Sequence, residues 1–270
     1  MPELPEVETT MRGLTPVLEG RRLVSVETRR EDLRRPFPAD LRQRLTGAAV
    51  TGLGRRAKYG LIGTNRGDTL VFHLGMSGRW RIDPADIGAH DHVLIETDAH
   101  RLLSLNDPRR FGSLDLMRTD ELDTYGPFVR MGPEPLGDTF TAAYLQGALK
   151  GRAAPIKALL LDQRIVAGLG NIYVCEALHM ARISPTRAGG KISRLRLAAL
   201  VDAVKAVLLS AIEAGGSTLR DYAQPDGALG YFSKQFLVYG REGEACACGT
   251  AVRRRVDGGR STFFCARCQR

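Results

Sequence analysis

The first half of the chain alternates short apolar runs with turn-forming residues. Runs at residues 23–26, 70–74 and 102–105 have the length of β-strands and are separated by Gly, Asp and Pro. A single predicted helix at residues 39–46, followed by a glycine, interrupts this pattern. Many short strands without alternating helices predict a β-sandwich or barrel over residues 20–130, and not a series of βαβ units.

The apolar period becomes helical after residue 132. The clearest helix spans residues 194–214 and ends at a Gly-Gly pair. Its apolar face consists of Leu197, Leu200, Val201, Val204, Leu208, Ala211 and Ile212. Shorter helices are expected at residues 139–150, 154–163 and 171–182, and the tail from about residue 236 returns to strands.

Together these patterns predict an α+β protein with several domains. We place a β-rich domain, which begins with a helix, at residues 1–130. A helical domain follows at residues 131–233, and a small C-terminal domain built around cysteines covers residues 234–270.

The composition is that of a globular protein, because 43% of its 270 residues are hydrophobic. No apolar run approaches the ~20 residues of a membrane span, and no basic-then-apolar signal peptide opens the chain. We therefore expect a cytoplasmic, bacterial protein without a membrane partner.

The charge balance favours a polyanionic partner. Lys and Arg number 39 against 30 Asp and Glu, which gives a formal net charge of +9. Nucleic acid is the first expectation and an anionic membrane the second, and general basicity without a specific partner is the alternative. Since nearly all of the excess is arginine, Lys58 stands out as one of few side-chain amines.

Two cysteine pairs frame a predicted β-hairpin near the C terminus. Cys246 and Cys248 precede it, Cys265 and Cys268 follow it, and Asp-Gly-Gly at residues 257–259 is its turn signal. The pattern predicts one structural Zn²⁺ per chain, held by four thiolates, with a disulfide or free thiols as the alternative.

The first pair is short, with one intervening residue instead of the usual two. In a straight strand the sulfurs of Cys246 and Cys248 would point to opposite faces, so chelation by both requires a kink, which Gly249 permits. All five histidines lie upstream, from His73 to His179. No nearby imidazole is therefore expected to substitute for a thiolate.

The first residues combine an amine with carboxylates. Removal of the initiator Met would leave Pro2 as a secondary amine beside Glu3. An α-amino group titrates near ~7.7–8.0, so much more of it is neutral at pH 7 than of a lysine, and a neutral amine forms Schiff bases. Glu3 could carry the protons. The alternative is an ordinary helix with Val7, Met11 and Leu14 as its buried stripe.

Three loops carry candidate contacts to nucleic acid. A Gly-Leu-Gly run precedes Asn171 at a helix start, where backbone N–H groups favour phosphate. The turn at residues 106–112 carries two arginines and Phe111, which could insert into a base stack, and residues 73–78 offer an apolar tip. An ordinary hairpin is the alternative. For His90-Asp91-His92, a phosphate contact or a satisfied polar cluster is favoured over a metal site.

In combination, these segments resemble the formamidopyrimidine-DNA glycosylases, the bacterial base-excision enzymes for oxidised purines. The motifs occur in the expected order over essentially the whole chain. They are Pro2-Glu3-Leu4-Pro5-Glu6, the Lys58 segment, His73-Leu74-Gly75-Met76-Ser77-Gly78, Asp107-Pro108-Arg109-Arg110-Phe111-Gly112, Gly168-Leu169-Gly170-Asn171-Ile172-Tyr173, Gly216-Ser217-Thr218-Leu219, Tyr239-Gly240-Arg241 and the C-terminal cysteines. Each motif is modest, but their joint occurrence is specific.

The resemblance implies an N-terminal β-sandwich, a helix–two-turn–helix domain and a C-terminal zinc-ribbon hairpin, with DNA in the cleft between. It implies that Pro2 attacks the sugar C1′ of the damaged nucleotide, with Glu3 as acid/base partner and Glu6 orienting the substrate. The partner would be duplex DNA with oxidised purines or abasic sites, cleaved by β,δ-elimination. We expect a monomer associated with the nucleoid through DNA.

The resemblance also implies a set of DNA contacts. Phosphates around the lesion would be held by Lys58, Asn171 and Arg260, and we place Lys58 and Arg260 in the catalytic group. The gap left by the flipped base would be filled by Met76, Arg109 and Phe111, with Arg109 facing the orphaned cytosine. The loop from residue 217 to about residue 225 would close over the lesion. The other residues assigned to DNA binding are His90, Lys157, Ser217, Thr218 and Tyr239.

Two rivals stay open at this point. The related endonuclease VIII type removes oxidised pyrimidines from the same scaffold, but the N-terminal motif and the gap-filling set favour the purine enzyme. A non-catalytic zinc-containing nucleic-acid-binding protein would account for the charge and the cysteines. It gives no reason for a processed Pro2 beside Glu3.

Overall fold

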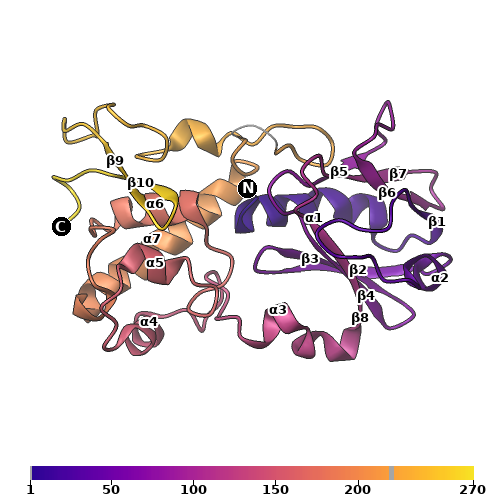
Figure 1. The fold of residues 1–270 in the computed structure, drawn as a ribbon, viewed down its shortest axis with the longest axis horizontal. Helices are drawn as coiled ribbons and strands as arrows, with labels where there is room; N and C mark the ends of the chain where they lie inside the picture. Colours follow the sequence, from indigo (N-terminus) through magenta and orange to yellow (C-terminus); the bar gives the residue numbers. More distant parts are fainter. Residues whose placement is uncertain (1, 219–221) are drawn as a thin grey trace. The chain divides into compact units, whose positions relative to one another are not determined.

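The computed structural model of the chain describes residues 2–218 and 222–270 (Figure 1). By its internal contacts the chain divides into two units. One unit comprises Met1–Val129 and Ala214–Tyr231, and the other comprises Arg130–Glu213 and Phe232–Arg270. None of the helices in the described ranges is long and apolar enough to cross a membrane.

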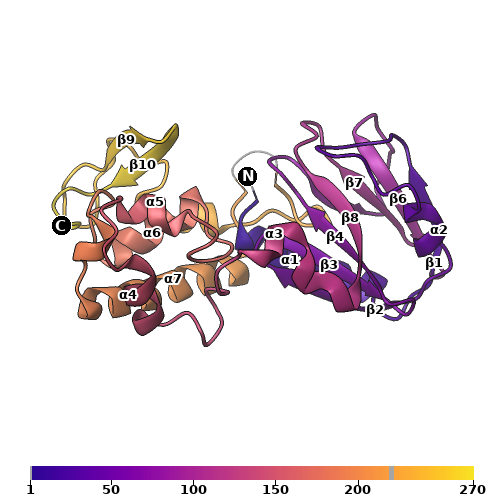
Figure 2. The same cartoon turned by 60° about the horizontal axis from the view of Figure 1, so that its bottom comes forward.

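Two four-stranded antiparallel sheets form the body of the first unit (Figure 2). The strand order is β1-β6-β7-β5 in one sheet and β2-β3-β4-β8 in the other. The strands are β1 (Leu23–Thr28), β2 (Val50–Arg56), β3 (Tyr59–Thr64), β4 (Asp68–His73), β5 (Arg79–Ile82), β6 (Asp91–Thr97), β7 (Leu102–Asn106) and β8 (Ser113–Arg118). The β-sandwich predicted from the apolar runs is confirmed.

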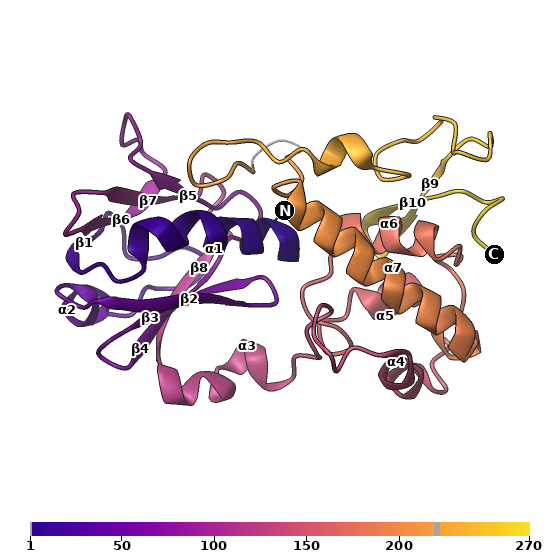
Figure 3. The same ribbon diagram turned by 180° about the vertical axis from the view of Figure 1, so that it is seen from behind.

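Helix α1 (Leu4–Leu18) covers one open side of this sandwich (Figure 3). It packs against β2 and β5, which are edge strands of the two sheets. Its stripe of Val7, Met11 and Leu14 is buried in one core with side chains of both sheets, so the predicted stripe is confirmed. Each such side chain contributes about 1.5–3 kcal/mol on burial, which fixes the N-terminal segment on the sandwich.

The described residues of the first unit also contain three short helical segments. They are α2 (Leu41–Leu45), a 3₁₀ helix at Thr119–Thr124 and α3 (Gly126–Val129). Helix α2 lies inside the range predicted for the single interrupting helix, 39–46. The segment Ala214–Tyr231 also belongs here, since the Ile82 N–H donates to the Pro225 carbonyl at 2.8 Å. The three domains drawn from the sequence, with boundaries after residues 130 and 233, stay a prediction.

The second unit is a helical bundle that carries the C-terminal hairpin. Its helices are α4 (Ala142–Leu149), α5 (Ile156–Leu160), α6 (Asn171–Met180) and α7 (Arg194–Glu213), with 3₁₀ helices at Gly189–Lys191 and Phe232–Gln235. Helix α7 packs against α4 and α6. Helix α5 ends earlier than predicted, because the Asp162 side chain accepts from the Arg164 N–H at 3.0 Å and turns the chain.

The hairpin consists of β9 (Arg253–Asp257) and β10 (Arg260–Phe264). Asp257 pairs with Arg260, so Gly258 and Gly259 are the two turn residues. Both have positive φ, 55° and 75°, as a type I′ turn requires. The hairpin predicted between the cysteine pairs is therefore present, with Arg260 at its tip.

Candidate active site

The N-terminal residues form a buried, carboxylate-rich site. Pro2 and Glu3 are buried ahead of α1, and Glu3 is its N-cap residue in an extended conformation. Glu6, at the third helical position, turns back so that its Oε2 accepts from the Glu3 N–H at 2.8 Å. This contact is one half of a capping box, and it fixes the backbone directly after Pro2.

The second oxygen of Glu6 reaches a segment far along the chain. Glu6 Oε1 accepts from the Ser217 N–H at 2.8 Å. The Tyr222 hydroxyl donates to the Glu6 carbonyl oxygen at 3.2 Å, and burial raises the pKa of Tyr222, so the phenol stays protonated. Two residues predicted to act on the damaged nucleotide, Glu6 and Ser217, thus lie in direct contact.

Gly216 makes this close approach possible. Its φ is +85°, in the region that favours glycine, and a Cβ at this position would lie 3.2 Å from Glu6 Oε1 and 3.1 Å from the Tyr222 ring. A side chain here would therefore push Ser217 away from the Glu6 carboxylate.

The base of the predicted lesion loop is closed by hydrogen bonds. The Thr218 N–H donates to the Gly230 carbonyl at 3.2 Å, and the Gly230 N–H donates to the Thr218 hydroxyl at 2.8 Å. The loop predicted to cover the lesion runs from residue 217 to about 225. Of this loop, residues 219–221 lie outside the described residues.

The three residues predicted to fill the gap in the duplex lie on two loops that touch. Met76 lies on the loop at residues 73–78, and Arg109 and Phe111 lie on the loop at residues 106–112. Gly75 of the first loop approaches the second so closely that a Cβ on it would lie 2.3 Å from the Phe111 carbonyl carbon. The Arg109 guanidinium lies over the Phe111 ring, 4.9 Å from its centroid. Phe111 is 46% exposed, Arg109 is exposed and Met76 is half-buried. The structure therefore brings an accessible apolar and cationic set together.

A buried carboxylate holds these two loops in place. Asp107 accepts from the Ser77 hydroxyl at 2.6 Å and from the Gly112 N–H at 2.8 Å. The Ser77 hydroxyl oxygen in turn accepts from the Arg109 N–H at 3.1 Å. His92 Nε2 donates to the Asp107 carbonyl at 2.9 Å. Both loops are thus held by hydrogen bonds to Asp107, which is completely buried and is itself bonded to His92 of the sandwich.

Two residues of the His90-Asp91-His92 motif are buried in the sandwich and form hydrogen bonds there. Asp91 is buried and accepts from Arg81 and from the Ser104 hydroxyl. His92 is buried against the Asp107 carbonyl, whereas His90 is exposed. The satisfied polar cluster favoured from the sequence is observed for Asp91 and His92.

Lys58 lies in the turn between β2 and β3. Arg56 pairs with Tyr59, so Ala57 and Lys58 are the two turn residues, and Ala57 has a φ of +52°. The Lys58 side chain is buried, and its charge contributes to lowering the pKa of His73 on the adjacent strand. The ammonium group therefore lies in the neighbourhood of that imidazole.

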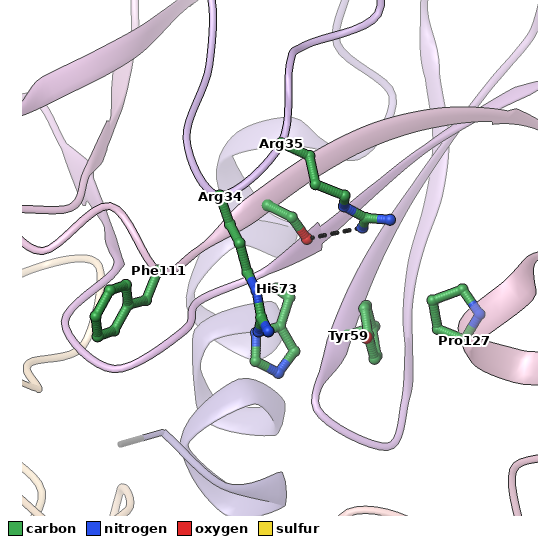
Figure 4. A pocket seen from close by; sticks show the side chains of 7 residues that line it. Arg34, Arg35, Tyr59, His73, Phe111 and Pro127 are labelled. Atoms are coloured by element: carbon green, nitrogen blue, oxygen red, sulfur yellow. Dashed lines mark hydrogen bonds between the residues drawn. The ribbon is translucent and has the colours of Figure 1, made fainter.

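A basic pocket of about 360 Å³ opens beside this turn (Figure 4). Its lining consists of Arg34, Arg35, Tyr59, His73, Phe111, Ser113 and Pro127. Figure 4 shows Arg34 alongside the His73 ring, while Arg35 donates to the Ser113 hydroxyl at 3.3 Å. Guanidinium groups beside an imidazole suit a phosphate. Arg34 and Arg35 were not among the residues predicted to contact DNA, although the Arg-Arg-Pro run at residues 34–36 was an available signal.

His73 faces this pocket as a neutral ring. Its Nδ1 accepts from the Gly75 N–H at 2.9 Å, so the single proton of the neutral ring lies on Nε2. Burial, followed by the charges of Lys58 and Arg34, lowers the pKa of His73 to about 4. The imidazole is thus a hydrogen-bond donor without a net charge.

In the second unit, three predicted DNA contacts meet at the hairpin. Lys157 Nζ and Asn171 Nδ2 both donate to the Ser261 carbonyl, at 3.1 and 2.9 Å, and Lys157 also donates to the Thr262 hydroxyl at 2.7 Å. Arg260, the residue before Ser261, is exposed. Lys157 is 3% exposed, so in this structure it supports the hairpin, and its contact with DNA stays a prediction.

Tyr239 is fixed by a buried carboxylate of α6. The two oxygens of Glu176 accept from the N–H groups of Leu237, Val238 and Tyr239 at 2.8, 3.0 and 2.7 Å. The Tyr239 ring packs edge-on against Phe263 of β10, with centroids 5.1 Å apart. This contact joins α6 to the hairpin.

The four C-terminal cysteines form one cluster. All four sulfurs lie within 4.8 Å of one another, with Cys246 to Cys268 at 3.9 Å and Cys248 to Cys265 at 3.5 Å. A tetrahedral zinc with Zn–S bonds of ~2.3 Å separates its sulfurs by about 3.8 Å. The arrangement fits one zinc ion.

The short first pair lies in a turn and not in a strand. The Gly249 N–H donates to the Cys246 carbonyl at 2.7 Å, and Gly249 has a φ of +82°. This turn supplies the kink that brings Cys248 to the same side as Cys246. Although every histidine lies upstream in the sequence, the fold brings an imidazole close to this pair, because His179 Nε2 is 3.3 Å from Cys246 Sγ.

Comparison with known families covers most of the chain. The model of the formamidopyrimidine-DNA glycosylase N-terminal domain matches residues 1–114. That of the formamidopyrimidine-DNA glycosylase H2TH domain matches residues 131–223, and that of the zinc finger found in FPG and IleRS matches residues 247–270.

Individual relatives match over their full length. The formamidopyrimidine-DNA glycosylases of Rhizorhabdus wittichii and Novosphingobium aromaticivorans are 73% and 66% identical to this chain, with complete coverage of both chains. The crystal structure of the MutM (FPG) protein of Thermus thermophilus has a TM-score of 0.90 at 43% identity, covering 99% of this chain and 98% of that one. A Lactococcus lactis FPG variant in complex with Fapy-dG-containing DNA has a TM-score of 0.92 at 34% identity, with both chains fully covered.

A β-sandwich, an H2TH domain and a four-cysteine zinc finger together define the class of DNA glycosylases to which these structures belong. Within that class, the chain belongs to the formamidopyrimidine-DNA glycosylase family. The zinc-finger match and the four-sulfur cluster assign one structural zinc to Cys246, Cys248, Cys265 and Cys268.

We expect one zinc ion per purified chain, lost in Cys265→Ser, because a hairpin this small has little core without a metal. Metal analysis of both proteins tests this expectation. Cys175→Ser is the matched control, since Cys175 lies outside the four-sulfur cluster and its variant should keep the zinc. Full activity and DNA affinity in metal-free protein would contradict the assignment.

The depressed pKa of His73 predicts a pH-dependent stability. Between pH 6.5 and about 4 the unfolded chain binds a proton that the folded imidazole does not, so stability falls as the pH is lowered through this window. His73→Gln should flatten the dependence in denaturant unfolding. An NMR titration of the ring reports the pKa itself, and a midpoint near 6.5 would refute the prediction.

Proposed function

We propose that this chain excises oxidised purines, such as 8-oxoguanine and formamidopyrimidines, from duplex DNA and then cleaves the abasic site. The observation that carries the proposal is the buried start of the chain, Pro2, Glu3 and Glu6, in a protein that matches named formamidopyrimidine-DNA glycosylases over its full length. The Lactococcus lactis structures with Fapy-dG and abasic-site DNA support the same substrate class.

The chemistry begins when Met1 is removed and the Pro2 amine is free. The amine attacks C1′ of the damaged nucleotide, and the bond between C1′ and the base breaks, so the base leaves with the electron pair and takes up a proton. The attack leaves a proton on the Pro2 nitrogen, and Glu3 accepts this proton and passes it to the sugar ring oxygen as the ring opens to the iminium. The iminium acidifies the C2′ proton, and its loss expels the 3′ phosphate.

A second elimination expels the 5′ phosphate, and hydrolysis of the remaining imine returns free Pro2. Glu6 is a positioning residue in this scheme, since its carboxylate holds the Glu3 and Ser217 N–H groups. Ser217 and Thr218 lie at the base of the loop that would cover the extruded base. Base extrusion from a duplex costs a few kcal/mol, and the protein has to offset this cost.

The DNA contacts divide by role. Met76 and Phe111 fill the gap in the base stack, and Arg109 donates to the cytosine left unpaired. Phosphates are held by Lys58, Asn171 and Arg260, with His90, Lys157 and Tyr239 as further DNA-binding residues. These contacts position the duplex, whereas the loop after Ser217 reads the lesion. We place the enzyme in the cytoplasm as a monomer, associated with the nucleoid through DNA.

Borohydride trapping tests the proposed function. Wild-type protein should form a covalent adduct with a duplex containing 8-oxoguanine opposite cytosine, and little with one containing thymine glycol. An adduct mainly with thymine glycol would indicate an endonuclease VIII-type enzyme. Binding without any adduct would leave a non-catalytic DNA-binding protein.

Pro2→Gly should reduce the trapped adduct strongly, and a protein that retains Met1 should lose it, because the nucleophile is the N-terminal amine. DNA affinity should stay near that of the wild type, which an electrophoretic shift on the same duplex measures. An undiminished adduct from the Met1-retaining protein would move the nucleophile to Lys58 or elsewhere.

Arg109→Ala should weaken the preference for cytosine over adenine opposite the lesion, since one good base contact contributes about 1–3 kcal/mol of discrimination. Single-turnover excision from the two duplexes gives the ratio directly. Arg110→Ala, a change of the neighbouring exposed arginine, is the control. An unchanged ratio in the Arg109 variant would place opposite-base selection in another residue.

A further inference from the structure

Helix α6 presents two side chains to the cysteine cluster. Cys175 and His179 are four residues apart, so they lie on one face of the helix. Helix α6 packs against β10, and Cys175 belongs to the same buried cluster as Cys246 and Cys265 (Figure 2). His179 occupies the last turn of the helix, where its ring reaches Cys246 Sγ.

The contact has the geometry of a hydrogen bond to sulfur. His179 Nε2 lies 3.3 Å from Cys246 Sγ, within the range of an N–H···S hydrogen bond. The group whose ligand atoms lie within 4.8 Å of one another comprises the four sulfurs and not this imidazole. His179 is therefore not one of the metal ligands, but it contacts one of them, Cys246.

The other ring nitrogen determines which one carries the proton. His179 Nδ1 is buried and has no hydrogen-bond partner in the part of the chain that the structure describes. A proton on Nδ1 would leave an N–H group buried without an acceptor, and it would set the Nε2 lone pair against a thiolate. With the proton on Nε2, the ring donates to sulfur, and only an acceptor lone pair is unsatisfied.

We propose that His179 is a positioning residue of the zinc site: its Nε2–H group donates to the Cys246 thiolate and holds this sulfur in the shortened Cys-x-Cys turn. Four thiolates around one Zn²⁺ leave an excess of negative charge, which a donor to sulfur offsets. The first pair has one residue between its cysteines instead of the usual two, so its backbone constrains the positions of the two sulfurs less. The imidazole supplies the missing constraint from α6, as an outer-shell partner does in other metal sites.

Zinc release from the full-length, zinc-loaded protein tests the proposal without reference to glycosylase activity. His179→Phe fills a similar space but cannot donate, so its zinc should bind about 10- to 100-fold more weakly in competition with a chromogenic chelator. In His179→Gln the amide nitrogen lies the same number of bonds from Cα as Nε2, so this variant should keep most of the affinity. Met180→Ala, at the exposed next position, is the control for helix stability.

Cobalt-loaded protein supplies a spectroscopic readout. In His179→Phe the thiolate-to-cobalt charge-transfer band should move to lower energy, while the d–d bands stay those of a four-thiolate site. His179→Gln should restore the wild-type band. A changed d–d envelope would make His179 a direct ligand and overturn the proposal. Wild-type zinc affinity and spectrum in the Phe variant, or a Gln variant as defective as Phe, would overturn it as well.

Discussion

The carboxylate of Glu6 joins the start of the chain to a segment 211 residues later. It is 2% exposed, and its two oxygens accept the backbone N–H groups of Glu3 and Ser217. A carboxylate buried without partners costs several kcal/mol, so both segments have to be in place together. Since the apolar stripe of α1 fixes Glu6 on the sandwich, the position of Pro2 and the base of the loop both depend on the core of the first unit.

A comparable device organises the second unit. The Ser261 carbonyl receives donors from α5 and α6, namely Lys157 and Asn171, and the cysteine cluster closes the other end of the hairpin. Arg260 stands directly before Ser261 at an exposed Gly-Gly turn. The backbone that carries this exposed cationic side chain is thereby fixed by hydrogen bonds from two helices and by the cysteine cluster. His179 adds a further contact from α6, to the sulfur of Cys246.

The elements that depend on neighbouring residues in the sequence could be predicted from it. Alternating apolar runs predicted the sandwich, the period of residues 194–214 predicted α7, and Asp-Gly-Gly between cysteines predicted the hairpin. Contacts between segments far apart in the sequence could not be predicted from it. His179 and Cys246 are 67 residues apart, and only the packing of α6 on the hairpin brings them together. Likewise, no spacing rule indicated that Lys157 would be buried under Ser261, or that Arg34 would stand beside His73.

The central claim is that the reacting amine is that of Pro2, held in place through Glu3 and Glu6. The most direct measurement is peptide mapping of the borohydride-trapped complex with an 8-oxoguanine:cytosine duplex. After nuclease and protease digestion, mass spectrometry locates the residual sugar adduct on one peptide. If Pro2 is the nucleophile, a single peptide is modified, the N-terminal one, which starts at Pro2 and carries the adduct on its amine. An adduct on the peptide that contains Lys58, with an unmodified N terminus, would contradict it.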